Sequence, residues 1–171
     1  MLMKKMLFPI IAALIVLTSC AASKKLTAEQ RYMKQQYNEL KSALNEADVT
    51  ILNDSVKVIF PDHVLFATAS DQLKDDIKPT FERFAAVLNK YDKTKILITG
   101  HTDNTGETAY NRNLSEMRAV NARQLLNNYK VDLDRMFTWG LGDHVPVADN
   151  ATDAGKARNR RVEFVMLYNL K

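Results

Sequence analysis

Cysteine is almost absent from the sequence, with one residue in 171, at position 20. A single cysteine excludes a disulfide within the chain. Histidine is scarce too: His63, His101 and His144 are isolated, and no spacing among them is typical of a pair of metal ligands. Stability must therefore come from an apolar core, for which 46% hydrophobic residues are sufficient. We expect no metal and no cofactor.

Long hydrophobic runs are lacking as well. The most apolar stretch, Leu7 to Leu17, has eleven residues, whereas a membrane-spanning helix needs about 20. It follows Lys4 and Lys5 and ends in the small residues of "LTSC". This arrangement is typical of a secretory signal.

The segment from Leu17 to Cys20 resembles the lipobox of bacterial lipoproteins. The resemblance implies cleavage before Cys20 and a diacylglycerol on its sulfur. We therefore predict a signal peptide at residues 1–19 and a lipid anchor at Cys20, so that the mature chain is tethered to a membrane rather than spanning it. An ordinary signal peptide, or a cysteine buried in the core, is the alternative.

Charge of either sign is in little excess. The formal net charge of +4 falls by two when Lys4 and Lys5 are removed with the signal. A chain this close to neutrality is not expected to bind nucleic acid. The short basic segment at residues 157–161, "ARNRR", is interpreted as a solvated or ligand-facing surface.

Residues 24–48 contain neither glycine nor proline, and their apolar side chains recur at spacings of three, four or seven. The pattern predicts an amphipathic helix, and Thr27 with Gln30 fits a capping box at its start. We interpret residues 20–48 as a lipidated cysteine followed by a helical linker that rests on the domain. A coiled coil is the alternative.

The remaining residues, 49–171, alternate between strand and helix patterns. The run "KILITG" at residues 95–100 is typical of a central strand buried on both faces. We predict an α/β class, an α+β sandwich in which a mixed β-sheet of about four strands packs against two main helices. Trp139 and the methionines are expected in its core. The other expected elements are a hairpin within 49–60, helices near 77–88 and 107–129, a strand at 137–140 and a terminal strand from Arg160.

Asp103 and Arg118 pose the main functional question. Helix periodicity places Arg118 within the apolar arc of its helix, and Asn111 shares that face. A buried guanidinium without a partner is costly, and Asp103, just after the buried strand, is the nearest candidate in the sequence. Two interpretations remain open. The two charges pair with each other, or they bind a zwitterion, the carboxylate taking an ammonium and the arginine taking a carboxylate.

Four motifs resemble, in the same order, those of the OmpA-like C-terminal domain family, which is shared by outer-membrane proteins, peptidoglycan-associated lipoproteins and flagellar-motor stators. The resemblance covers about residues 49–170. The motifs are "GHTDNTG" at 100–106, "NRNLSEMRA" at 111–119, Gly140 with Gly142 and Pro146, and "NATDAGKARNRRVE" at 150–163.

The resemblance implies a lipoprotein of the outer membrane whose domain faces the periplasm and binds peptidoglycan non-covalently. The ligand would be the diaminopimelate of the stem peptide, whose free end bears an ammonium and a carboxylate. Asp103 would then receive the ammonium and Arg118 the carboxylate. Thr105, Asn111 and Arg160 would hold the peptide and its terminal carboxylate.

The chain departs from some family members in the loop after Phe66, where Ala67 and Ala69 stand in place of polar side chains. Thr68 and Ser70 remain there. We therefore expect binding to depend more on backbone groups of this loop, or to be weaker.

Two other classes of function remain as alternatives. His101, Thr102 and Asp103 lie together at a strand end, a usual place for an active site. Ser115, however, lies on a helix without a nucleophile elbow, and we do not expect an enzyme. The other class is an envelope protein that docks on protein partners without binding the wall, with the helix at 27–47 as its docking element.

Overall fold

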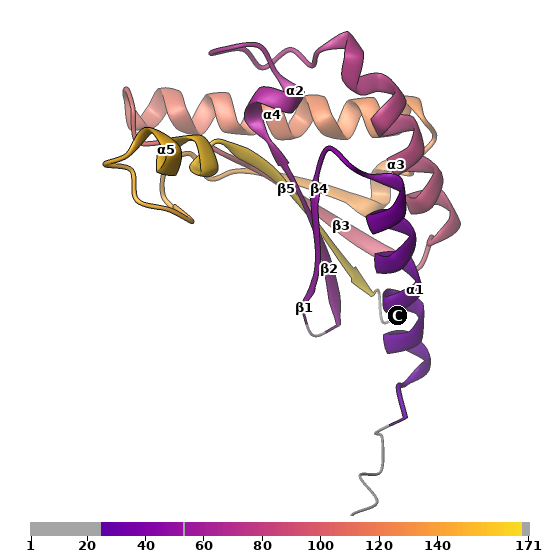
Figure 1. The fold of residues 1–171 in the computed structure, drawn as a ribbon. Helices are drawn as coiled ribbons and strands as arrows, with labels where there is room; N and C mark the ends of the chain where they lie inside the picture. Colours follow the sequence, from indigo (N-terminus) through magenta and orange to yellow (C-terminus); the bar gives the residue numbers. More distant parts are fainter. Residues whose placement is uncertain (1–24, 53, 169–171) are drawn as a thin grey trace, which may run out of the picture.

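The computed structural model describes residues 25–52 and 54–168, so the predicted signal peptide and Cys20 lie outside the described residues. A five-stranded mixed sheet forms one layer, and α1, α3 and α4 cover one of its faces (Figure 1). The predicted mixed α/β class is confirmed, with five strands where about four were expected. The strands are β1 (Asp48–Leu52), β2 (Ser55–Pro61), β3 (Thr94–His101), β4 (Met136–Gly140) and β5 (Arg161–Tyr168).

The strand order β1-β2-β5-β3-β4 places the last strand of the sequence in the centre of the sheet. β3 pairs with β4 in parallel, whereas the β1–β2, β2–β5 and β5–β3 pairings are antiparallel. The register pairs His101 at the end of β3 with Arg161 at the start of β5. The residues that follow β3 and those that precede β5 are therefore brought to the same end of the sheet.

Local signals account for where the long helices begin. Thr27 caps α1 through a capping box with Gln30, as predicted. Pro79 lies in the first turn of α3, where its missing amide hydrogen removes no helical hydrogen bond. The short helices α2 and α5 were not predicted, because they have too few turns to show a periodic pattern. The helices are α1 (Ala28–Ala43), α2 (Asp62–Leu65), α3 (Lys78–Lys90), α4 (Thr108–Asn128) and α5 (Asp153–Asn159), and short 3-10 turns lie at Asp75–Ile77 and Leu133–Arg135.

An aromatic cluster forms the centre of the core between the sheet and α3. Phe60 of β2, Phe81 and Phe84 of α3, and Phe164 of β5 have no exposed surface. Their ring centroids are 5.1–6.2 Å apart, in tilted or edge-to-face arrangements. This geometry favours aromatic pairs beyond the burial of their area.

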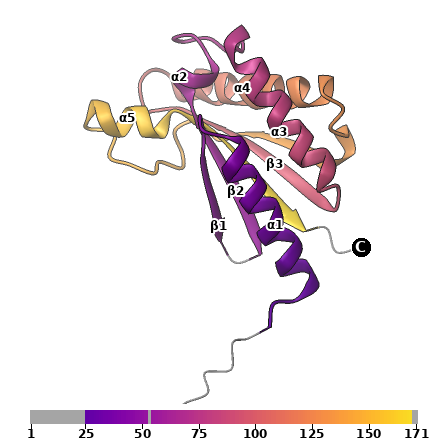
Figure 2. The same ribbon diagram turned by 45° about the vertical axis from the view of Figure 1, so that its right-hand side comes forward.

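The helix expected as a linker packs onto the domain, as Figure 2 also shows for its position across β2. Met33 and Leu40 of α1 are fully buried. Glu39 forms an ion pair with Lys90 of α3, with 2.7 Å between Oε1 and Nζ. The structure thus has a helix resting on the domain rather than a free coiled-coil strand, and the buried face of α1 is part of the core.

Trp139 does not lie in the core, and the expectation from the sequence was wrong. It is 56% exposed, and Phe137 on the same strand is 54% exposed. β4 is an edge strand, and its alternate residues point to the face of the sheet that α4 does not cover.

Two glycines allow α4 to approach the sheet closely. A Cβ built on Gly100 would lie 2.0 Å from the backbone oxygen of Ser115, and one on Gly140 would lie 2.6 Å from that of Arg112. Both clashes involve the helix backbone, which a side-chain rotation cannot relieve. The glycines therefore fix the depth at which α4 lies on β3 and β4.

We expect Gly100→Ala to displace α4 and to lower the free energy of unfolding by about 1–3 kcal/mol, because overpacking forces backbone shifts. Urea denaturation measures the loss. Gly106→Ala is the control, because a Cβ there meets nothing within 4 Å and only its positive φ of 90° opposes the substitution. An equal loss in the two variants would contradict the packing argument.

Candidate functional site

A cavity of about 710 Å³ lies at the end of the sheet where β3 stops and β5 begins. Its walls come from α2, the loop after Phe66, the loop after β3, and α4. The structure brings together all the residues that the sequence analysis assigned to ligand binding in the domain. These are Asp103, Thr105, Asn111, Arg118 and Arg160.

Asp103 lies in the loop after β3 and is 8% exposed. Its Oδ1 accepts a hydrogen bond from the Thr105 amide at 2.9 Å, and its Oδ2 accepts one from Nη1 of Arg160 at 2.5 Å. Burial acts to raise the pKa of Asp103, but these hydrogen bonds outweigh burial and the net pKa lies below its ordinary value. Asp103 is therefore a carboxylate at neutral pH.

Arg118 points inward from α4 and is 3% exposed. Its Nη2 lies 3.0 Å from Oδ1 of Asp62, and its Nε donates a hydrogen bond to the Ser70 carbonyl at 2.9 Å. The guanidinium carbon lies 5.0 Å from the centre of the Phe66 ring, within the range of a cation–π contact. Burial lowers the pKa of Arg118 and the Asp62 carboxylate raises it, but a guanidinium remains charged at any physiological pH.

Asp62 is the partner that the sequence analysis missed. It begins α2 directly after β2, is 8% exposed, and its amide donates a hydrogen bond to the Arg160 carbonyl at 3.0 Å. Burial raises the pKa of Asp62, while Arg118 and Arg160 lower it. An acid just past an alternating strand was the available signal, and it was weak because many such acids face solvent.

Asp103 and Arg118 do not form an ion pair with each other anywhere in the described part of the chain. Asp103 pairs with Arg160, whose Nε also lies 3.9 Å from Oδ2 of Asp62, and Asp62 pairs with Arg118. The direct pair considered from the sequence is therefore wrong. Two acids and two arginines alternate along one wall, and their formal charges cancel.

Asn111 and Thr105 shape the loop beside this wall. The Asn111 amide nitrogen donates to the Thr105 carbonyl at 3.1 Å and to the Asp103 carbonyl at 3.4 Å. Asn111 is 3% exposed, so its amide group fixes the loop backbone from beneath. Thr105 is exposed at the rim.

The loop after Phe66 is held by α4 through its backbone. Besides the bond from Arg118 to the Ser70 carbonyl, Asn121 donates a hydrogen bond to the Asp71 carbonyl at 2.7 Å. Ala69 has a positive φ of 55°, a conformation that is uncommon for a residue with a side chain. The alanines of this loop therefore line the cavity on a backbone that α4 positions.

Of the three residues that raised the enzyme alternative, Thr102 and Asp103 line the cavity and His101 does not, and Ser115 is also absent from its lining. Ser115 is fully buried, donates its hydroxyl to the Arg112 carbonyl at 2.8 Å and accepts from the Gly142 amide at 2.9 Å. His101 is 2% exposed, and its Nε2 lies 3.1 Å from Oγ1 of Thr99. The two side chains act in packing and in loop geometry.

The described part of the chain contains neither a metal-binding cluster nor a membrane-spanning helix. Within residues 25–52 and 54–168, three or more His, Cys, Asp or Glu side chains nowhere gather in a way that could hold a metal ion. Over the same residues, every helix is too short or too polar to cross a membrane.

Comparisons with known proteins give one family and several relatives. The model described as the OmpA family matches residues 65–160. "Probable lipoprotein YiaD" from Escherichia coli is 36% identical over 137 residues, which cover 79% of this chain. That alignment covers 63% of the relative, so the chain spans less than two thirds of its length.

Solved structures share both the fold and part of the sequence. The cell wall anchor of the T6SS from Pseudomonas aeruginosa superposes with a TM-score of 0.69 at 33% identity, covering 82% of this chain and 99% of that one. The peptidoglycan-associated lipoprotein from Burkholderia pseudomallei gives a TM-score of 0.56 at 32% identity, covering 60% and 87%.

The buried His101 predicts a loss of stability in acid. Burial first, and then the positive charge of Arg161, lower the pKa of His101 to about 4, although the Glu163 carboxylate acts in the opposite direction. Between pH 6.5 and 4 the unfolded chain binds a proton that the folded chain does not, so the free energy of unfolding falls with pH, by roughly 3 kcal/mol from this group. Urea denaturation at pH 7 and pH 4.5 should show a smaller fall for His101→Gln than for the natural chain. An equal fall would contradict the assignment.

Proposed function

The chain belongs to the OmpA family, and from this premise we propose that it is an outer-membrane lipoprotein that tethers the membrane to peptidoglycan by binding the diaminopimelate of the stem peptide. The cavity with Asp103 and Arg118 in one wall is the observation that carries the proposal. Its volume lies in the range of sites for small ligands. Relatives named as lipoproteins and as a cell wall anchor support a structural role in the envelope.

The ligand enters as a zwitterion beside a cluster of two acids and two arginines whose charges already cancel. Its carboxylate binds the guanidinium of Arg118, and its ammonium binds the carboxylate of Asp103. Nη2 of Arg118 lies 3.0 Å from Oδ1 of Asp62, but the two groups are not aligned for a hydrogen bond. The ligand carboxylate therefore competes with an ion pair that lacks hydrogen-bond geometry. Because a zwitterion adds no net charge, the site avoids burying an unbalanced ion.

Selectivity follows from the same two contacts. Lysine in place of diaminopimelate retains the ammonium for Asp103 but has no carboxylate for Arg118. A buried arginine without that carboxylate gains nothing from the ligand, and its charge-assisted hydrogen bonds are roughly twice as strong as neutral ones. The site is therefore suited to diaminopimelate and not to lysine.

The lipid on Cys20 supplies the membrane end of the tether, with the domain facing the periplasm. No cofactor takes part in this function, and the bond to the wall is reversible because it is made of hydrogen bonds and ion pairs. Many copies on one membrane share the load by multivalency.

The alternative function, docking on envelope protein partners alone, receives less support. It named the helix at 27–47 as the docking element, and α1 uses one face of that helix to bury Met33 and Leu40 against the domain. Partners that bind the outer face of α1 remain compatible with wall binding.

We expect Asp103→Asn and Arg118→Ala each to weaken binding of the domain to diaminopimelate-type peptidoglycan by about 30-fold or more, since truncating one partner of a buried charge pair costs 2–5 kcal/mol. Sedimentation with purified wall measures the bound fraction. A lysine-type wall should bind weakly in every case.

Arg112→Ala is the matched control, because Arg112 is an exposed arginine on another face of α4. Circular dichroism must show a native spectrum for each variant before a loss is assigned to the site. If both folded variants sediment like the natural chain, the assigned site is wrong. If the natural chain itself stays in the supernatant, partner docking replaces wall binding.

A further inference from the structure

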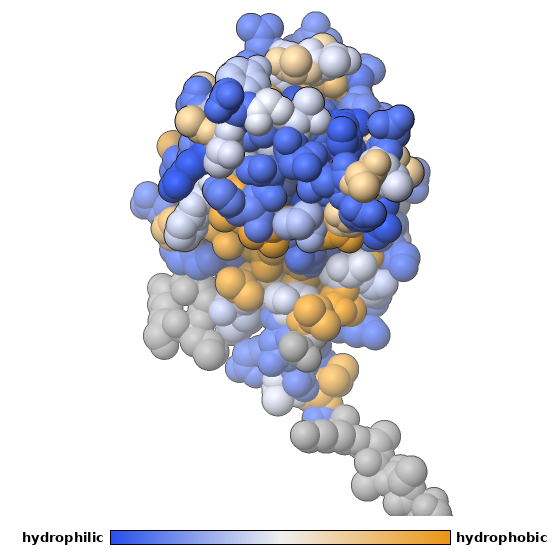
Figure 3. Space-filling model, turned by 90° about the vertical axis from the view of Figure 1, so that its left-hand side faces the viewer, coloured by the Kyte–Doolittle hydropathy of each residue, from blue (hydrophilic) through white to orange (hydrophobic). Residues whose placement is uncertain are grey.

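Exposed leucines gather at the end of the domain opposite the ligand cavity. Leu52 at the end of β1, Leu167 near the end of β5 and Leu26 just before α1 are 67%, 48% and 46% exposed. Leu52 pairs with Ser55, and Ser55 pairs with Leu167, so the two leucines flank one position in the same row of the sheet. Figure 3 shows hydrophobic residues gathered in the lower half of one face, towards the end where α1 begins, beneath a mostly hydrophilic upper half.

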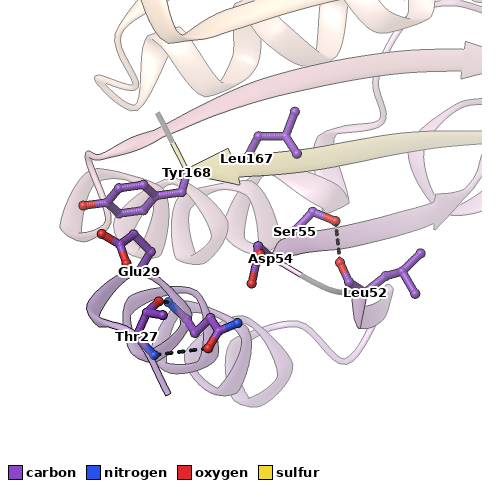
Figure 4. A pocket seen from close by; sticks show the side chains of 8 residues that line it. Thr27, Glu29, Leu52, Asp54, Ser55, Leu167 and Tyr168 are labelled. Carbon is purple, nitrogen blue, oxygen red and sulfur yellow. Dashed lines mark hydrogen bonds between the residues drawn. The ribbon is translucent and has the colours of Figure 1, made fainter. Parts of the chain in front are cut away.

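A hollow of about 630 Å³ is lined by Leu52 and Leu167 on one side and by the first turn of α1 on the other. Figure 4 shows Leu52, Ser55 and Leu167 on the strand side of the hollow, and Thr27 and Glu29 at the start of α1. No other part of residues 25–52 and 54–168 covers these leucine side chains. An exposed cluster of apolar side chains on a protein surface typically marks a site that contacts a membrane or another protein.

The sequence sets how far this end can be from the lipid. Cys20 precedes the first described residue, Lys25, by residues 20–24, which are at most about 18 Å long when fully extended. The leucines lie beside the start of α1. An acyl anchor on Cys20 therefore holds this end of the domain close to the bilayer at all times.

The ligand cavity lies at the other end of the same strands. β2 runs from Ser55, beside the leucines, to Pro61, next to Asp62 in the cavity. Its seven residues correspond to about 23 Å. Figure 1 shows the end of β1 and the start of α1 at one end of the domain and α2 at the other. A domain that stands on its leucine end directs the cavity away from the membrane.

We propose that this leucine end, formed by Leu26, Leu52 and Leu167, rests on the bilayer that holds the acylated Cys20 and inserts these side chains at the headgroup boundary. The proposal rests on the lipid anchor of the proposed function. The domain then acts as a spacer of fixed orientation, and its own length sets the height of the wall site above the membrane.

Apolar contact rather than charge drives this orientation. Glu29 and Asp54 border the hollow and Lys25 directly precedes Leu26, so charges of both signs lie near the contact and neither sign dominates it. The contact is therefore expected to change little between low and high salt, unlike adsorption through a basic surface.

Site-specific quenching on vesicles tests the orientation. The acylated full-length protein is placed in vesicles of phosphatidylethanolamine and phosphatidylglycerol that contain a nitroxide on the lipid headgroup. A fluorophore is attached to Asp54→Cys in the leucine end or to Asp153→Cys at the start of α5. With Cys20 acylated, the introduced cysteine carries the single free thiol. We expect strong quenching at position 54 and little at position 153.

The leucine contact is then removed while the anchor is kept. Leu26→Ser, Leu52→Ser and Leu167→Ser together should remove most of the quenching at position 54, with the protein still on the vesicles. Leu133→Ser, Val145→Ser and Val147→Ser together are the matched control, because these side chains are exposed elsewhere at 38%, 49% and 47%. If the leucine variant loses its native circular dichroism spectrum, the Leu52→Ser variant alone takes its place.

Three results would overturn the proposal. These are equal quenching at positions 54 and 153, unchanged quenching in the folded leucine variant, or a fluorescence change without nitroxide lipid that grows with protein density and so identifies a second copy. Mass spectrometry separates this inference from the proposed function. A chain without acyl groups refutes the anchor itself, whereas an acylated chain with an unquenched position 54 refutes only the orientation, and wall sedimentation is unaffected by either.

Discussion

The buried guanidinium of Arg118 requires compensation inside the protein, and several segments are arranged around that requirement. Asp62 at the start of α2 supplies the opposite charge, the Ser70 carbonyl accepts from Nε, and the Phe66 ring lies against the cation. These groups come from the segment between β2 and α3, whereas Arg118 comes from α4. The charge thus joins two parts of the chain at the edge of the cavity. The close approach of α4 to β3, which Gly100 permits, sets where that charge lies.

The second consequence of this requirement is a wall of alternating charge. Asp62, Arg118, Asp103 and Arg160 balance one another before any ligand arrives. Such a wall gives no strong attraction to a simple anion or cation, because either would leave one buried charge unbalanced. A ligand that carries a positive and a negative charge close together can replace the internal ion pairs without changing the net charge of the cavity. The end of a diaminopimelate side chain has this character, and the recognition of peptidoglycan that we propose follows from it.

The two ends of the sheet have different proposed roles, one in binding peptidoglycan and the other in contacting the membrane. The ends of β2 and β3 and the start of β5 form the charged cavity, while the end of β1, the start of α1 and the end of β5 form the leucine end. α1 links the predicted membrane anchor to the domain that carries the cavity. It follows the anchor in the chain, and its buried face packs against α3 and β1. Force applied between membrane and wall would therefore pass through the packed core and not through a free linker.

The sequence by itself determined the long helices and the inward direction of Arg118. The capping box of α1, the mixed α/β class and the inward position of Arg118 all follow from periodicity and local hydrogen bonding, which involve residues a few positions apart. The tertiary structure decided which groups meet. Asp62 rather than Asp103 faces Arg118, and Trp139 is exposed because β4 is an edge strand. Both outcomes depend on strand order, with β5 placed between β2 and β3, and that order is set by hydrogen bonds between segments distant in sequence, on which local patterns carry no information.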